Sequence, residues 1–109
     1  MSKNKPTVDE YKGMGYTKAT KALLKTINAE YGDNELLYPT GFADCIVGIA
    51  TSPVSFEPVL VLDRVGIIKK LMKLDKMPWD DASEFFEHNI IGSYMGDNTP
   101  LYITLSKDL

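Results

Sequence analysis

The stretch PVLVLDRVGIIKKLMK, residues 58–73, decides the fold because its apolar spacing changes in the middle. Its first part has four successive apolar residues, which is typical of a strand that is covered on both faces. From residue 64 the apolar residues follow helical spacing instead, at Val65, Ile68, Leu71 and Met72, with Lys69, Lys70 and Lys73 left for water. The pattern predicts a strand at 58–63 that leads directly into a helix at 64–76.

Further elements are predicted on both sides of this stretch. Residues 44–51, DCIVGIAT, indicate a strand that a six-residue loop joins to the strand at 58–63, so the two should form a hairpin. Residues 78–91 indicate a second helix, because Asp80 and Asp81 suit the positive end of its dipole. A third strand is expected at 99–105.

The first 40 residues are expected to lie outside the core. Residues 1–16 are polar and predict a flexible arm, whereas 17–40 predict an accessory helix, capped by Thr17, and a connector. Lys18, Lys21 and Lys25 line one side of that helix as a solvated face or a site for an acidic partner. Residues 41–109 form the expected core domain. The predicted fold class is α+β: an N-terminal helix, then ββααβ, with a three-stranded antiparallel sheet and two helices on one face.

Composition narrows the function classes. The chain has 109 residues, a net charge of −3 and a pI near 5.0, which argues against general nucleic-acid binding. Its single cysteine, Cys45, cannot form an internal disulfide, and the first residues contain no apolar stretch of the signal-peptide type. No apolar run is long enough to span a bilayer. A cytoplasmic protein without a membrane segment is therefore expected.

Residues 41–104 carry a pattern that resembles a family of small uncharacterised proteins of tailed bacteriophages and prophages. The pattern is Asp-x-Ile-Val-Gly, then Asn-Ile-x-Gly, then Gly-x-x-Thr-Pro, and the residues that match are Asp44, Gly48, Asp63, Phe86, Asn89, Gly92, Gly96, Thr99 and Pro100. Two positions depart from the pattern, because the family more often has an aromatic residue at His88 and a Ser or Thr cap at Pro78. The resemblance implies a phage setting in the host cytoplasm, and the first departure argues against a catalytic role for His88.

The cysteine, the histidine and the glycines that could belong to a catalytic or binding site are each expected to have a structural role. Cys45 alternates with apolar residues and is expected to be a buried thiol, and His88 is expected to be an exposed histidine paired with Glu84 one helical turn earlier. The acidic residues around His88 match no metal-site template, so we expect no metal and no cofactor. Gly92 is expected to be left-handed past a helix end, and residues 96–98 to form a turn.

Asn89 is the polar residue that most needs partners. On helical spacing it continues the apolar stripe of Ala82, Phe85 and Phe86, so we expect a buried amide that holds the corner between helix and strand. Leaving such a group without a hydrogen bond costs about 1–3 kcal/mol. Its expected partners are backbone groups of the following turn or the carboxylate of Asp44. A small-ligand pocket built on Asp44, Asn89 and Thr99 is the alternative interpretation.

These observations favour a non-enzymatic phage-type protein that binds a host or phage protein, as an accessory, takeover or counter-defence factor. An acidic surface with one aromatic anchor is its expected partner surface: Trp79, Asp80, Glu84 and Glu87. The alternative function is a domain that binds a nucleotide or other small molecule at the Asp44, Asn89 and Thr99 corner. A third hypothesis is an enzyme that uses those groups with His88.

Oligomeric state follows from the strand at 58–63. Its four apolar residues predict that both sheet faces are covered, although the two core helices are placed on only one. The second face could be covered by the N-terminal helix, through Leu23, Ile27 and Tyr31, or by a second copy of the chain. We favour the homodimer, because the core that resembles the phage family lacks this helix.

Overall fold

The computed structural model describes residues 3–4, 16–34, 36–51, 53, 55–92 and 98–109. It is an α+β structure, as predicted, and its main elements are three helices and a three-stranded sheet. The helices are α2 (Lys18–Tyr31), α3 (Arg64–Asp75) and α4 (Trp79–Phe85), and the sheet consists of β3 (Ile46–Thr51), β4 (Pro58–Asp63) and β5 (Leu101–Ile103). None of the helices in this described part is long and apolar enough to cross a membrane.

The sheet is mixed, so the prediction of an all-antiparallel sheet is wrong. Strands are ordered β3-β4-β5, with β3 antiparallel to β4 across a bulge near Gly48, and β4 parallel to β5. Two antiparallel helices between β4 and β5 would return the chain to the end of the sheet that it left, which would make β5 antiparallel to β4. The register Val61↔Leu101 and Asp63↔Ile103 shows that the chain enters β5 from the other end.

The order of elements also differs from the expected one. A two-stranded antiparallel sheet pairs β1 (Lys3–Asn4) with β2 (Tyr38–Pro39) on either side of α2 in the chain. The 3-10 turn η1 (Ala43–Cys45) precedes β3, and η3 (Ser106–Asp108) follows β5. Of the flexible arm expected at 1–16, only residues 3–4 and 16 are described, and Tyr16 is buried in the core, so the prediction is wrong at that residue. Two-residue strands leave no periodic signal in a sequence, which is why this pair was not predicted.

Helix boundaries follow local chemistry. Thr17 caps α2 by accepting a hydrogen bond from the Thr20 amide at 3.2 Å, as predicted. The helix α3 begins directly after β4, without a loop, and ends at Lys76, whose φ of 54° is left-handed. Beyond α4 the chain continues as a π-helical turn, η2 (Phe86–Ile91).

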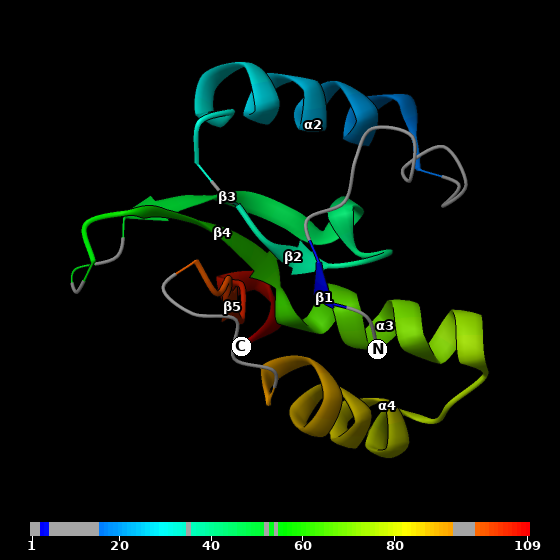
Figure 1. Ribbon diagram of the computed structural model, residues 1–109. Coiled ribbons are helices and arrows are strands. Elements are labelled where there is room, and N and C mark those ends of the chain that lie inside the picture. The colour runs from blue at the N-terminus through cyan, green and yellow to red at the C-terminus, as the bar shows by residue number, and fades with distance from the viewer. Residues whose placement is uncertain (1–2, 5–15, 35, 52, 54, 93–97) are drawn as a thin grey trace.

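One hydrophobic core joins the helices to the sheet. Leu24 and Ile27 of α2 belong to the same cluster of buried residues as Leu60 of β4 and Ile68 of α3. In Figure 1, α2 runs above the hairpin of β3 and β4, and α4 lies below it. The N-terminal helix therefore contributes directly to the main core.

The second face of the sheet is covered only in part. Val59 of β4 is 2% exposed, but Val61, two residues further on the same face, is partly exposed. The register places Leu101 beside Val61, and Leu101 is 48% exposed. Ile103, two residues beyond Leu101, is 38% exposed. Although α2 packs into the core, an apolar area on β5 thus remains exposed to solvent. The homodimer stays a prediction.

Candidate functional site

The helix α4 and the turn η2 present two different sides. Their buried residues, Ala82, Phe86 and Ile90, follow each other at intervals of four and pack into the core. Phe86 meets the ring of Tyr102 edge-on, with the ring centres 5.3 Å apart. Asp80, Glu84 and Glu87 are solvent-exposed, and Trp79, the first residue of α4, is 39% exposed; we call these four residues the acidic face. These residues are accessible to a partner.

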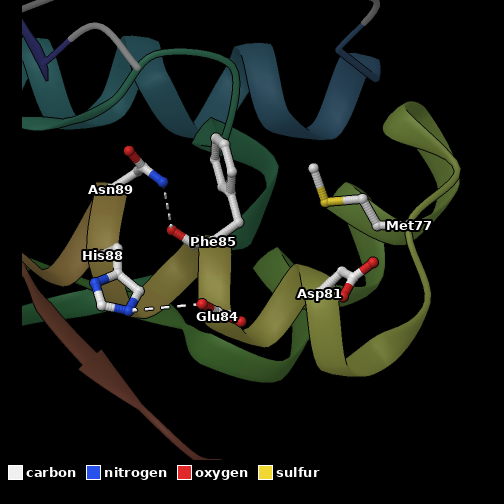
Figure 2. A pocket seen from close by; sticks show the side chains of 6 residues that line it. All are labelled: Met77, Asp81, Glu84, Phe85, His88 and Asn89. Atoms are coloured by element: carbon white, nitrogen blue, oxygen red, sulfur yellow. Dashed lines mark hydrogen bonds and ion pairs between the residues drawn. The ribbon is translucent and has the colours of Figure 1, made fainter.

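A pocket of about 460 Å³ borders the acidic face, and we call it the α4 pocket. Figure 2 shows the six residues that line it: Met77, Asp81, Glu84, Phe85, His88 and Asn89. Met77 and Phe85 are partly buried and pack against the core, so they give the pocket an apolar side. Asp81 and Glu84 are exposed carboxylates. An apolar wall next to two carboxylates fits a cationic group that carries a hydrocarbon chain.

His88 is an exposed histidine, as predicted. Its Nε2 lies 4.0 Å from Oε1 of Glu84, and both side chains are 74% exposed (Figure 2). Cys45 lines a different pocket, so it does not share this site with His88. A nucleophile requires its base within hydrogen-bond reach. Cys45 and His88 therefore do not form a pair of nucleophile and base in this structure.

The prediction that Asn89 is buried is wrong. Its side chain is exposed at the α4 pocket, and its Nδ2 donates to the Phe85 carbonyl at 3.2 Å (Figure 2). The buried row runs through Phe86 to Ile90, so Asn89 lies one position before the inward-facing residue. The apolar stripe was traced at intervals of three and four through Phe85 and Phe86 to Asn89, whereas the buried residues follow each other at intervals of four.

The π-helical turn also changes the role of Gly92. Its amide donates to the Glu87 carbonyl at 3.2 Å, a five-residue spacing that is typical of a π-helix. Its φ is −64°, so the prediction of a left-handed residue is wrong. A Cβ at this position would lie 2.7 Å from the His88 carbonyl oxygen, which explains the glycine by close approach. The turn predicted at residues 96–98 falls mainly on residues outside those described.

A second pocket, of about 380 Å³, lies between α3 and η1, and we call it the lysine pocket. Its lining residues are Asp44, Cys45, Gly66, Lys69, Lys70, Lys73 and Leu74. The Nζ of Lys70 donates to the Gly41 carbonyl at 2.6 Å and to Oδ1 of Asp44 at 2.8 Å. It also lies over the rings of Tyr16 and Phe42, 5.2 and 5.6 Å from their centres. Four contacts therefore fix this ammonium group in place.

Cys45 is a buried free thiol, as predicted, although it belongs to η1 and not to the following strand. Removal from water, with the nearby Asp44 carboxylate, raises the pKa of the Cys45 thiol to about 12. A thiol is a nucleophile only after it has lost its proton. At neutral pH the group is thus a proton-bearing, unreactive part of the pocket wall.

The three residues of the predicted ligand corner do not share a pocket. Asp44 lines the lysine pocket and Asn89 lines the α4 pocket, whereas Thr99 lies just before β5 and lines neither. The sequence prediction did not assign Met77, Asp81 and Phe85 to the α4 pocket, nor the three lysines and Leu74 to a site. Lys70 was assigned to water because its neighbours Lys69 and Lys73 share its spacing, and nothing local marks the one lysine that reaches a carbonyl 29 residues away.

Among the described residues, no three His, Cys, Asp or Glu side chains lie together in a way that could hold a metal ion. Comparison of the chain with models of protein families, with curated proteins and with solved structures found no match.

Proposed function

We propose that this protein binds another protein through the acidic face and the α4 pocket. One observation carries the proposal: an exposed tryptophan, Trp79, lies on the same short helix as a pocket that has an apolar side and two carboxylates. Protein interfaces are enriched in aromatic anchors, and pockets beside such anchors hold the side chains that contribute most to affinity.

The charge of this surface indicates the chemistry of the partner. Asp81 and Glu84 line the pocket, and Asp80 and Glu87 are further exposed acids of the same helix and turn. A lysine or arginine of the partner could pack its methylene groups on Phe85 and direct its cation to the carboxylates. Charge-assisted hydrogen bonds of this kind are about twice as strong as neutral ones. The partner is thus a protein with an exposed basic segment.

The biological setting is proposed from the sequence. The resemblance to small phage and prophage proteins supports a host or phage protein as the partner, in the host cytoplasm. The role is that of a non-enzymatic accessory, takeover or counter-defence factor. Self-association through β5 is a separate part of the proposal, supported by the exposed Leu101 and Ile103.

Charge reversal tests the proposal. Tagged wild-type protein and the double variant Asp80→Lys, Glu84→Lys are used to capture partners from host cells, with and without infection. The matched control is Glu30→Lys, Asp33→Lys, which reverses two acids near the end of α2 that are also exposed. A partner retained by the control and lost by the α4 variant supports the proposal. A partner set that is the same for all three proteins contradicts it.

The alternative of a small-molecule domain loses its original site, because Asp44 and Asn89 line different pockets. Asp44 nevertheless lines the lysine pocket, whose three ammonium groups suit an anionic ligand.

A further inference from the structure

The lysine pocket combines a concave shape with positive charge in a chain whose net charge is negative. Lys69, Lys70 and Lys73 come from one side of α3 and line the same pocket of about 380 Å³. Asp44 is the acid among its lining residues, and the carboxylate of Asp63 lies beside two of them, Gly66 and Cys45. Three ammonium groups against these two carboxylates leave one positive charge, although the whole chain carries −3. The positive charge is therefore concentrated locally, which raises the local concentration of anions.

The three lysines are not equivalent. Lys70 is partly buried and bonded to Gly41 and Asp44, so its charge is already balanced. Lys69 and Lys73 are exposed, and in the part of the chain that the structure describes neither makes an ion pair. They are four residues apart on a helix, where like charges face each other and destabilise the helix slightly. An anion placed between them would remove this repulsion.

The other lining residues of the pocket suit a small ligand better than the flat surface of a macromolecule. Cys45 is buried and uncharged, and Leu74 is 62% exposed at the pocket. Lys70 is held by contacts from two other parts of the chain, so one wall is fixed before any ligand arrives. Pockets for small molecules have volumes of about 300–1,000 Å³, and this pocket falls at the lower end.

We propose that the lysine pocket binds a small dianion, a phosphate monoester or a dicarboxylate, between the ammonium groups of Lys69 and Lys73. Lys70 and Asp44 form the fixed wall, and Leu74 contacts the apolar part of the ligand. This site goes beyond the proposed protein-binding function and shares no residue with the α4 pocket or the acidic face. Either one can therefore fail without the other.

The test uses the full chain and two defined probes, inorganic phosphate and succinate, titrated at constant ionic strength against chloride. Two-dimensional amide NMR spectra follow every residue. We expect saturable shifts at Gly66, Lys69, Lys73 and the neighbouring Asp44 amide for at least one probe. Phosphate alone would assign the site to phosphate monoesters, and succinate alone to dicarboxylates. No saturable shift with either probe would overturn the proposal.

The chain supplies its own control. Lys21 and Lys25 on α2 have the same spacing of four and are also exposed, but they line neither of the two pockets described above. The variant Lys69→Gln, Lys73→Gln should weaken probe binding at least tenfold, whereas Lys21→Gln, Lys25→Gln should leave it unchanged. Equal shifts at both lysine pairs, or equal losses in both variants, would mean general counter-ion attraction and would reject the site. Amide spectra of each variant without probe show whether it is folded.

Discussion

The ammonium group of Lys70 lies 2.8 Å from Oδ1 of Asp44 and joins the middle of α3 to the 3-10 turn before β3. The same group donates to the Gly41 carbonyl at 2.6 Å. The two segments are more than twenty residues apart in the chain, so this contact fixes their tertiary arrangement. It also forms one wall of the lysine pocket, which makes Lys70 a structural residue in a candidate binding site.

We expect Lys70→Met to lower the free energy of unfolding by about 1–3 kcal/mol, because the Gly41 carbonyl and the Asp44 carboxylate both lose a charged donor. Methionine keeps most of the side-chain packing. Urea denaturation of both proteins gives the difference. Lys69→Met, at an exposed neighbouring position, is the control and should change stability by less than about 0.5 kcal/mol. Equal effects of the two substitutions would show that the contact is not stabilising.

Asn89 and Phe86 should differ sharply in their response to alanine. Asn89 is exposed, so Asn89→Ala should change stability by less than about 0.5 kcal/mol. Phe86 is 0% exposed, and Phe86→Ala should cost about 3–5 kcal/mol. Thermal and urea unfolding of the two variants measure this. A loss above about 1 kcal/mol for Asn89→Ala would restore the structural role that the sequence suggested.

Asn89 and Phe86 also show which features of this fold a local sequence pattern can predict and which it cannot. The existence and type of α2, α3 and α4 and of the β3–β4 hairpin follow from apolar spacing, and Thr17 was identified as a cap because its chemistry is local. Asn89 was misplaced because it lies within the π-helical turn, and a one-residue change in spacing moves a side chain from the core to the surface. The parallel pairing of β5 and the reach of Lys70 depend on tertiary contacts, which a local pattern does not encode.

Lys76 offers a stabilising substitution. It ends α3 with a φ of 54°, a conformation that costs a residue with a Cβ about 1–2 kcal/mol and that glycine adopts freely. Its side chain is exposed, so Lys76→Gly should raise stability by about 1 kcal/mol. Lys73→Gly, inside the same helix, should instead lower stability by about 1 kcal/mol. If both glycines destabilise, the left-handed conformation at Lys76 is not present in solution.

Cys45 should react slowly and should link stability to alkaline pH. Burial, together with the Asp44 carboxylate, raises the pKa of the Cys45 thiol from 9.0 to about 12. The native protein thus holds this proton more tightly than the unfolded chain, so the stabilisation is present below pH 9.0 and is lost as the pH rises toward 12. At pH 8 a thiol reagent should modify the native protein at least ~100-fold more slowly than the protein in denaturant.

Two comparisons check this. Cys45→Ala should remove the contribution of the thiol, so its stability should fall less between pH 9 and pH 12 than that of the wild type. Equal rates of thiol modification in native and denatured protein would contradict the buried, protonated state.

The open part of the sheet leads to the prediction on oligomeric state. Val61 and Leu101 are neighbours on one face, and Ile103 follows on the same strand, so three apolar side chains that are at least partly exposed lie together there. The strand β5 is at the edge of the sheet, where its free backbone groups can pair with another strand. A second copy packed face to face against this area would bring the two sets of apolar side chains together around a twofold axis and remove them from water. We therefore expect light scattering to give a dimer at micromolar concentration.

Leu101→Lys should shift it to a monomer, because the substitution places a charge in the apolar contact, whereas Leu109→Lys, at a position that is 93% exposed, should leave the dimer intact. A monomeric wild-type protein, or a dimer that survives Leu101→Lys, would reject association through this face.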